Sequence, residues 1–223
     1  MCFSPQADVV AGVVIGVVAV DVFRHRPPRR DLALAALVPL LAVHSIVEAF
    51  VWWSERGQLS ESVGTGATYV YLFFAFVVLP VYLPVAVLAR ESSPERRRQM
   101  TAFVAIGLYV SCSLLWSLVQ GPVTATLHHH YISYSIGVAN ADIVVPLYAL
   151  ATCGVALLST SRYLVVFGAL NIVVVAVLTV LTANGLTSLW CFWAALSSVA
   201  IAMLVRRDED ATQASSLKKA LRR

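Results

Sequence analysis

Charged residues are scarce in this sequence. Asp, Glu, Lys and Arg make up 13% of the 223 residues, whereas 59% are hydrophobic and the mean hydropathy is +0.80. Because an ordinary soluble domain has about 25% charged residues, this composition excludes a water-soluble globular fold, a disordered chain and a nucleic-acid-binding module. We therefore expect a membrane protein whose surroundings are the lipid bilayer and which has no nucleic-acid partner.

Cysteines and the common cofactor motifs are also few. The four cysteines form no C-x-x-C pair, and the sequence has neither a Gly-rich phosphate loop nor an H-E-x-x-H motif. We predict no cofactor and no resident metal. Cys2 and Cys191 are both expected on the outer side of the membrane, where a disulfide can persist; a bridge between them and two free thiols both remain open.

Long apolar runs account for most of the chain. A bilayer-spanning helix needs about 20 apolar residues, and seven runs approach that length. They cover residues 5–23, 32–53, 67–89, 100–120, 138–159, 163–183 and 186–205. The pattern predicts an all-α, polytopic bundle of seven transmembrane helices over residues 1–205, followed by a polar tail over residues 206–223.

The basic residues predict the orientation of this bundle. When the helices alternate in direction, fifteen of the sixteen Lys and Arg residues fall on one side, and only Arg56 falls opposite. The positive-inside rule then places the tail in the cytoplasm and the N-terminus outside. We expect a multi-pass protein of the cell membrane; its oligomeric state does not follow from the sequence.

Ionisable groups inside the spans gather toward the outer side. His44, Glu48 and Trp52 recur every four residues, which puts them on one face of the second span. Asp142 lies near the outer end of the fifth span, and His130 lies in the outer loop before it. Because an ionisable group in hydrocarbon is costly, each is a candidate functional residue.

Aromatic residues show the same asymmetry. All five tryptophans fall in the outer halves of their predicted helices, either as an interfacial belt or as the lining of an outward-opening cavity. One face of the fourth span, with Tyr109, Cys112 and Trp116, is expected to point into the bundle. The candidate substrate-binding residues are Trp52, Trp116, Tyr131, Tyr134, Trp190 and Trp193.

Four segments resemble those of a bacterial family of seven-span membrane proteins of unknown function. They are the opening Met1-Cys2-Phe3-Ser4, the segment Glu48-Ala49-Phe50-Val51-Trp52, the turn Gly121-Pro122-Val123-Thr124-Ala125 with the His/Tyr segment that follows it and ends at Tyr134, and the segment Leu189-Trp190-Cys191-Phe192. This resemblance covers nearly the whole chain. It implies the seven-span topology and singles out Glu48, His130, Tyr134 and Cys191, but it implies no activity.

The architecture also resembles that of integral-membrane terpene cyclases, which close prenylated meroterpenoid precursors. The likeness lies in chain length, number of spans and a carboxyl group on the second span. Two other seven-span families fit less well. A retinal protein needs a lysine in its last span, and the ceramidase-like hydrolases need a His-x-x-x-His pair there; the run 186–205 contains neither.

The leading hypothesis is therefore acid-initiated cyclisation of a lipophilic isoprenoid. Such a reaction needs an acid that keeps its proton, and an apolar environment favours the neutral form of a carboxyl group. Glu48 would donate the proton, Asp142 or an outer-loop histidine would remove the final one, and the aromatic rings would stabilise cationic charge.

Two alternatives stay open. The first is a metal-dependent membrane hydrolase that uses His44, Glu48, His130 and Asp142 as ligands or base. The second is a non-catalytic protein whose outer cavity binds a lipid or another small molecule.

Overall fold

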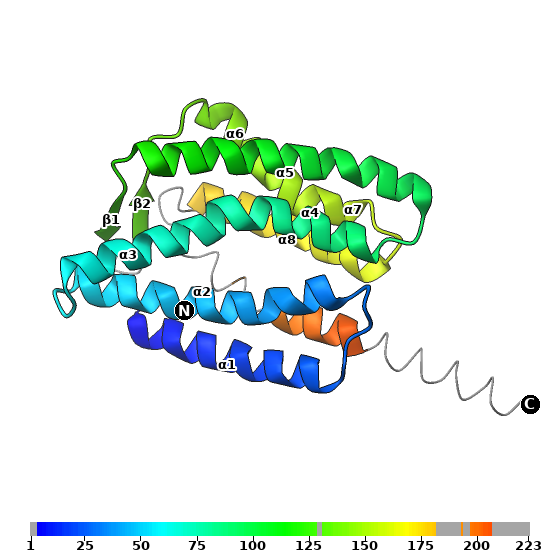
Figure 1. Ribbon diagram of the computed structural model, residues 1–223, viewed down its shortest axis with the longest axis horizontal. Helices are drawn as coiled ribbons and strands as arrows, with labels where there is room; N and C mark the ends of the chain where they lie inside the picture. Colours follow the sequence, from blue (N-terminus) through cyan, green and yellow to red (C-terminus); the bar gives the residue numbers. More distant parts are fainter. Residues whose placement is uncertain (1–3, 129–130, 182–192, 194–196, 207–223) are drawn as a thin grey trace, which may run out of the picture.

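The chain folds into a bundle of long helices in a computed structural model that describes residues 4–128, 131–181, 193 and 197–206 (Figure 1). The main α-helices are α1 (Pro5–Arg24), α2 (Leu32–Glu55), α3 (Glu61–Leu72), α4 (Leu79–Arg90), α5 (Pro94–Gln120), α6 (Ala141–Ala149), α7 (Val155–Leu157) and α8 (Arg162–Leu181). Two π-helical segments, η1 (Phe73–Val78) and η2 (Leu150–Gly154), join α3 to α4 and α6 to α7.

Four helical stretches are long and apolar enough to cross a membrane. They are Pro5–Arg24, Leu32–Glu55, Glu61–Arg90 and Pro94–Gln120. Shorter apolar helices follow at Ala141–Leu157, Arg162–Val177 and Ser197–Arg206. The chain is therefore mostly helical, as expected, with helices long and apolar enough to cross a membrane, and each of the seven predicted runs contains helix within the described residues.

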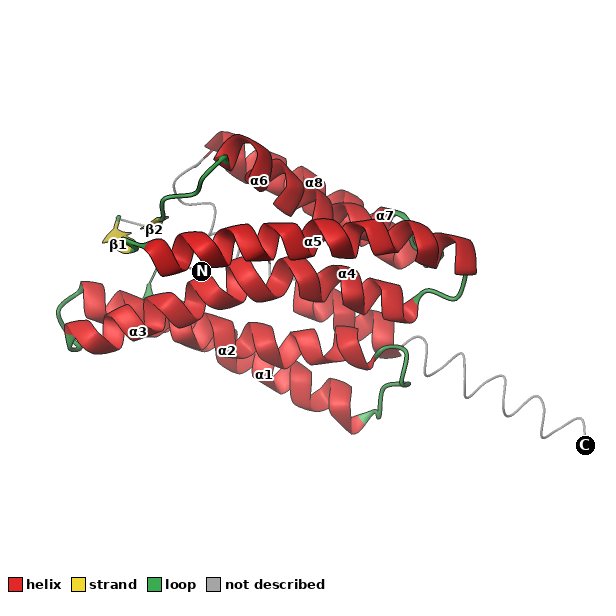
Figure 2. Ribbon diagram, turned by 45° about the horizontal axis from the view of Figure 1, so that its top comes forward, coloured by secondary structure: helices red, strands yellow, loops and turns green. Residues whose placement is uncertain are grey.

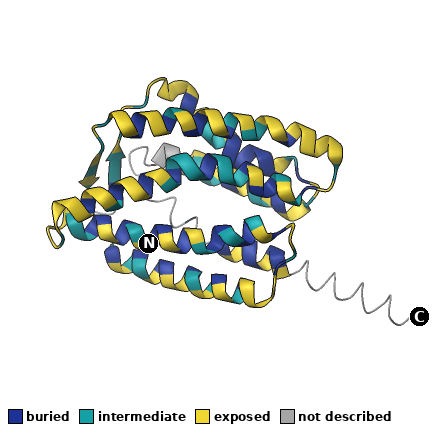
Figure 3. Cartoon of the chain, in the orientation of Figure 1, coloured by how far each residue is buried: buried dark blue, intermediate teal, exposed yellow. Residues whose placement is uncertain are grey.

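The α1–α2 pair forms one side of the bundle. Ser4 caps α1 by accepting a hydrogen bond from the Ala7 amide at 3.2 Å, and Pro5 begins the helix. At Gly12 a Cβ atom would lie 2.5 Å from Cγ1 of Ile46 and 3.0 Å from the carbonyl oxygen of Ala42. Figure 3 shows buried positions along both facing sides. The missing side chain thus fixes how α1 and α2 sit against each other.

The third and fifth predicted spans, which contain Pro80 and Pro146, depart from regular α-helix. The segment η1 ends just before Pro80, and η2 follows Pro146. Side chains from neighbouring helices donate to the carbonyl groups of η1: the Tyr148 hydroxyl donates to Ala75 at 2.7 Å and the Ser111 hydroxyl to Val77 at 2.8 Å. Backbone groups that leave the regular helical pattern are therefore satisfied without water.

The face that α5 turns inward differs from the predicted one. Tyr109 is 50% exposed, Trp116 is 64% exposed, and Cys112 is exposed too. The buried face contains Gly107 and Ser111 instead. A Cβ atom at Gly107 would lie 2.0 Å from the carbonyl oxygen of Pro80. Close backbone approach needs small residues, so the bulky aromatic face of α5 points outward.

A β-hairpin occupies the predicted outer loop after α5. Its strands β1 (Thr124–Leu127) and β2 (Ile132–Ser135) pair antiparallel, with Thr124 opposite Ser135 and Leu127 opposite Ile132. The hairpin lies at the same end of the bundle as the α2–α3 loop (Figures 1 and 2). Ile132 is fully buried against Val51 and Trp52 of α2, so the hairpin covers the C-terminal end of this helix.

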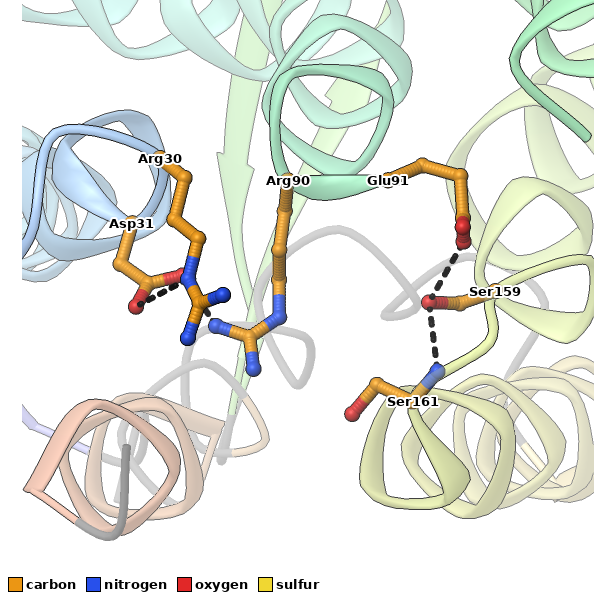
Figure 4. Close-up of polar contacts among 6 residues, drawn as sticks. All are labelled: Arg30, Asp31, Arg90, Glu91, Ser159 and Ser161. Atoms are coloured by element: carbon orange, nitrogen blue, oxygen red, sulfur yellow. Dashed lines mark hydrogen bonds and ion pairs between the residues drawn. The ribbon is translucent and has the colours of Figure 1, made fainter. Parts of the chain in front are cut away.

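The opposite end of the bundle holds the α1–α2 loop, the α4–α5 turn and the start of α8 (Figure 1). Polar contacts tie these segments together. Arg90 pairs with the buried Asp31 at the start of α2 (Figure 4). Arg206, at the end of the Ser197–Arg206 helix, pairs with Asp21 of α1. Within the described residues, Arg56 is the one basic side chain at the hairpin end, as the sequence predicted.

Candidate functional site

The predicted stripe on α2 is buried. His44 is 6% exposed, Glu48 is 0% exposed and Trp52 is 1% exposed, although the three positions span two helical turns. Since residues four apart lie on one face of a helix, the burial of all three confirms that this face points into the protein. The carboxyl group of Glu48 therefore lies in the interior of the bundle, between an imidazole and an indole one turn away on either side.

An aromatic column surrounds His44. Its ring lies parallel to that of Tyr71, with 4.1 Å between the centroids and 9° between the planes. The Phe74 ring is tilted by 41° to the His44 ring, with 4.8 Å between the centroids, and Tyr134 of β2 stacks on Tyr71 at 4.9 Å. Residues from α2, α3, η1 and β2 thus meet in one stack. The Nδ1 atom of His44 is buried and has no hydrogen-bond partner among the described residues.

Trp52 lies at the C-terminal end of the row formed by His44, Glu48 and Trp52 on α2. Its ring packs against Val51 and Ile132, and the guanidinium carbon of Arg56 lies 5.2 Å from the ring centroid, within the range of a cation–π contact. The buried Nε1 atom of Trp52 finds no hydrogen-bond acceptor in the part of the chain that the structure describes. Trp52 and the hairpin together separate Glu48 from the outer surface.

A second buried carboxyl group lies at a similar depth. Asp8 of α1 is 1% exposed. Gly12 of α1 faces Ala42 and Ile46 of α2, and the two helices run in opposite directions. Asp8, one helical turn before Gly12, therefore lies at the level of Ile46–Phe50 of α2. Asp8 and Glu48 therefore lie at about the same height in adjacent helices.

Asp142 does not join this cluster. It is exposed in the first turn of α6, whose buried residue Val144 packs against Val110 and Leu114 of α5. Since α6 packs on α5 and Asp142 is exposed, the structure does not bring Asp142 beside the buried Glu48. The sequence indicated only the depth of Asp142 and not the face of α6 that is buried.

The remaining predicted residues divide in the same way. Tyr134 lies in the aromatic column, whereas Tyr131 stacks on His128 at 4.7 Å near the hairpin turn. Trp193 donates a hydrogen bond to Oδ1 of Asn171 at 2.6 Å and so belongs with α8. Trp116 is on the outer surface of α5. His130, Trp190, Cys2 and Cys191 lie outside the described residues.

Two residues of the column were not singled out from the sequence. Tyr71 is fully buried and contacts both His44 and Tyr134, and Phe74 follows it by three residues. An aromatic pair at that spacing was a detectable helical-face signal. The second strand also had a signal, since Ile132 and Tyr134 alternate with serines in 132–135, as is typical of short strands.

The described part of the site assembles no set of metal ligands, and the predicted ligand His130 lies outside it. Among the residues that the structure describes, no group of three or more His, Cys, Asp or Glu side chains is close enough to hold an ion. The hydrolase hypothesis needed Asp142 beside His44 and Glu48, and Asp142 is exposed on α6.

Comparison with known proteins gives the family but no activity. A family of unknown function (DUF6629) matches residues 1–216. The chain belongs to this family. No curated protein and no solved structure matches it. Membership of DUF6629 agrees with the expected resemblance to an uncharacterised family. The function of this DUF6629 protein therefore has to be argued from the buried cluster around Glu48.

Proposed function

We propose that this DUF6629 protein is a membrane-embedded cyclase that protonates and closes a prenylated or isoprenoid lipid, with Glu48 as the proton donor. The observation that supports this proposal best is the position of the Glu48 carboxyl group. It is fully buried in a long apolar helix, one turn from the imidazole of His44 and one turn from the indole of Trp52. Such a shielded acid suits a substrate that enters from the bilayer.

The proposed reaction conserves every atom of the substrate. The Glu48 proton adds to one carbon of an alkene and leaves a cation on its neighbour. The electron pair of a second alkene or an arene then forms the new carbon–carbon bond. A proton finally leaves the carbon beside the last cation, and its electron pair forms a double bond. Substrate and product therefore have the same mass and differ in shape.

His44 is the candidate acceptor of that final proton. Asp142 is exposed on α6, whereas His44 is on the same face of α2 as Glu48, at the spacing where side chains meet. The proton passes from His44 back to Glu48 before the next cycle. The aromatic rings of Tyr134 and Trp52 would stabilise the cation between these two steps.

The test is to express the chain in a host that makes prenylated metabolites and to separate the lipid extract by chromatography and mass spectrometry. We expect a new compound with the mass of a host metabolite. Glu48→Gln should abolish it, whereas Glu61→Gln, which removes an exposed carboxyl group at the start of α3, should not. Full activity of the Glu48→Gln variant would discard the mechanism.

The same extracts distinguish a binding protein from an enzyme. A carrier would retain one lipophilic molecule unchanged, in equal amounts in the wild type and in Glu48→Gln, and would yield no isomer. That result would replace the cyclase by the non-catalytic alternative.

We also infer that the protein crosses the cell membrane seven times, with its N-terminus outside. Three shorter apolar helices beyond the four long ones support the number of spans. The gathering of basic residues at the end opposite the hairpin supports the orientation. The site around Glu48 would then face the outer leaflet.

A further inference from the structure

A second site lies between α8 and the helix Ser197–Arg206, on elements that contribute nothing to the cluster around Glu48. The two helices enclose a groove of about 510 Å³. Leu164, Ile201 and Leu204 form a floor that is at least 95% buried, and Tyr163 and Met203 form half-exposed rims. We call this hollow the α8 groove. The α8 groove is therefore a hollow formed mainly by apolar side chains of two helices, and it is open on one side.

Among the described residues that line the α8 groove, charge lies at one end. Arg162, the first residue of α8, is the one charged side chain in that described lining. From there the groove runs along α8 as far as Leu170, about 12 Å at the rise of an α-helix. Arg162 belongs to the end of the bundle where the other basic residues gather. The groove is thus apolar along its length and positive at the membrane surface.

We propose that the α8 groove binds one acyl chain of an anionic phospholipid whose phosphate pairs with Arg162. A groove that opens toward the hydrocarbon layer and is lined by apolar side chains is filled by lipid rather than by water. Basic pockets between helices on the cytoplasmic side are the usual binding sites of anionic headgroups. The first turn of α8 adds the positive end of a helix dipole, and Tyr163 provides an interfacial aromatic ring.

Charge also favours a lipid over a second copy of the chain. In a two-fold dimer within one membrane, the basic ends of both copies lie at the same surface, so Arg162 would face another positively charged end. An anionic headgroup neutralises this charge instead. Arg96 reinforces the positive surface nearby, because it donates hydrogen bonds to the carbonyl groups of Leu158 and Ser159 in the turn before α8.

The experiment uses the full-length protein in a neutral detergent, with phosphatidylglycerol and phosphatidylcholine of identical acyl chains added in equal amounts. Native mass spectrometry counts the lipids that stay bound. We expect the wild type to retain phosphatidylglycerol preferentially. Arg162→Gln should weaken that retention about fivefold, which is the effect of one basic residue at a membrane surface, and should leave the two lipids nearly equal.

A second variant tests the apolar part of the α8 groove. Ala200→Trp places a large ring in the groove and should reduce the retention of both lipids. Arg98→Gln and Val20→Trp are the matched controls, since Arg98 is exposed on α5 and Val20 is 54% exposed on α1, both outside the groove. Both controls should behave like the wild type.

Three results would overturn the proposal. The first is equal retention of phosphatidylglycerol by the wild type and Arg162→Gln. The second is loss of the lipid preference in Arg98→Gln to the same extent. The third is a shift from dimer to monomer in Ala200→Trp with lipid retention unchanged, which would assign the α8 groove to a second copy. Because Arg162 is exposed, its variant decides the matter even if Ala200→Trp fails to fold.

Discussion

Glu91 shows how one side chain can join segments that are far apart in the sequence. Its carboxylate accepts hydrogen bonds from the amides of Ser92 and Ser93, and from the amide and hydroxyl of Thr160 beyond α7. Figure 4 shows the same carboxylate beside Ser159. Burial raises the pKa of Glu91, but the hydrogen bonds together outweigh it, so the pKa lies below its ordinary value of 4.5.

The lowered pKa of Glu91 predicts an acid-sensitive contribution to stability. A carboxylate with a depressed pKa in the folded state stabilises the protein fully above about pH 4.5, and the contribution is lost as the pH falls through the folded pKa. Glu91→Gln should therefore lower the free energy of unfolding by about 2 kcal/mol at pH 7. The difference from the wild type should shrink on acidification, as measured by denaturation in detergent micelles.

The exposed Glu95, four residues further on, provides the control for this prediction. Glu95→Gln should change the free energy of unfolding by less than about 0.5 kcal/mol at any pH. A loss in Glu91→Gln that stays constant from pH 7 to pH 3 would show that the carboxylate charge is not what the contacts need.

At the residue scale, the sequence predicted periodic features and missed partners from other elements. The spacing of His44, Glu48 and Trp52 was sufficient to predict a common buried face, because a helix repeats every 3.6 residues. No such rule brings Tyr71 or Tyr134 to His44. Those contacts depend on how α3 and the hairpin pack on α2, which the local pattern does not determine.

At the scale of elements, hydropathy predicted the helices and left their irregularities unseen. The third span was expected from residue 67, but α3 begins at Glu61 and includes Gly64. Glycine usually weakens a helix, yet a Cβ atom at Gly64 would lie 1.8 Å from Oγ of Ser54 on α2. The inward face of α5 was mispredicted for a related reason, since small residues there permit backbone contact while large rings contact lipid.

The contact of α5 with the first turn of α4 gives a matched pair of glycine substitutions. Gly107→Ala would bring a methyl group against the carbonyl of Pro80, which belongs to the backbone and cannot move aside, whereas Gly16→Ala on α1 meets nothing within 4 Å. We expect the first to destabilise the protein by about 1–3 kcal/mol. The second should stabilise it by about 0.5–1 kcal/mol through helix propensity.

Denaturation of both glycine variants in the same micelles tests the assigned contact. Similar free energies of unfolding for Gly107→Ala and Gly16→Ala would mean that α5 does not approach α4 so closely at Pro80. A loss in Gly107→Ala together with lower accumulation in the membrane would place the defect in helix assembly.

At the scale of the whole molecule, the two ends of the bundle have different chemistry. The hairpin end carries Trp52, Tyr134 and the single described basic residue Arg56. The other end carries the ion pairs of Asp31 with Arg90 and of Asp21 with Arg206. Cytoplasmic loops are enriched in Lys and Arg. This polarity therefore predicts that the cluster around Glu48 lies in the outer half of the bilayer and that the Arg162 end of the α8 groove lies in the inner leaflet.

Truncated fusions to alkaline phosphatase, which is active only outside, and to green fluorescent protein, which fluoresces only inside, test this arrangement. Fusions after residues 58, 122 and 184 should have phosphatase activity, and fusions after residues 92, 160 and 223 should fluoresce. The pair at residues 184 and 223 decides the seventh span, because both would report the same side if the chain from 186 to 205 did not cross. The reverse pattern throughout would move Glu48 to the cytoplasmic half of the bilayer and would contradict the positive-inside assignment, since the sixteen Lys and Arg residues would then lie almost entirely outside.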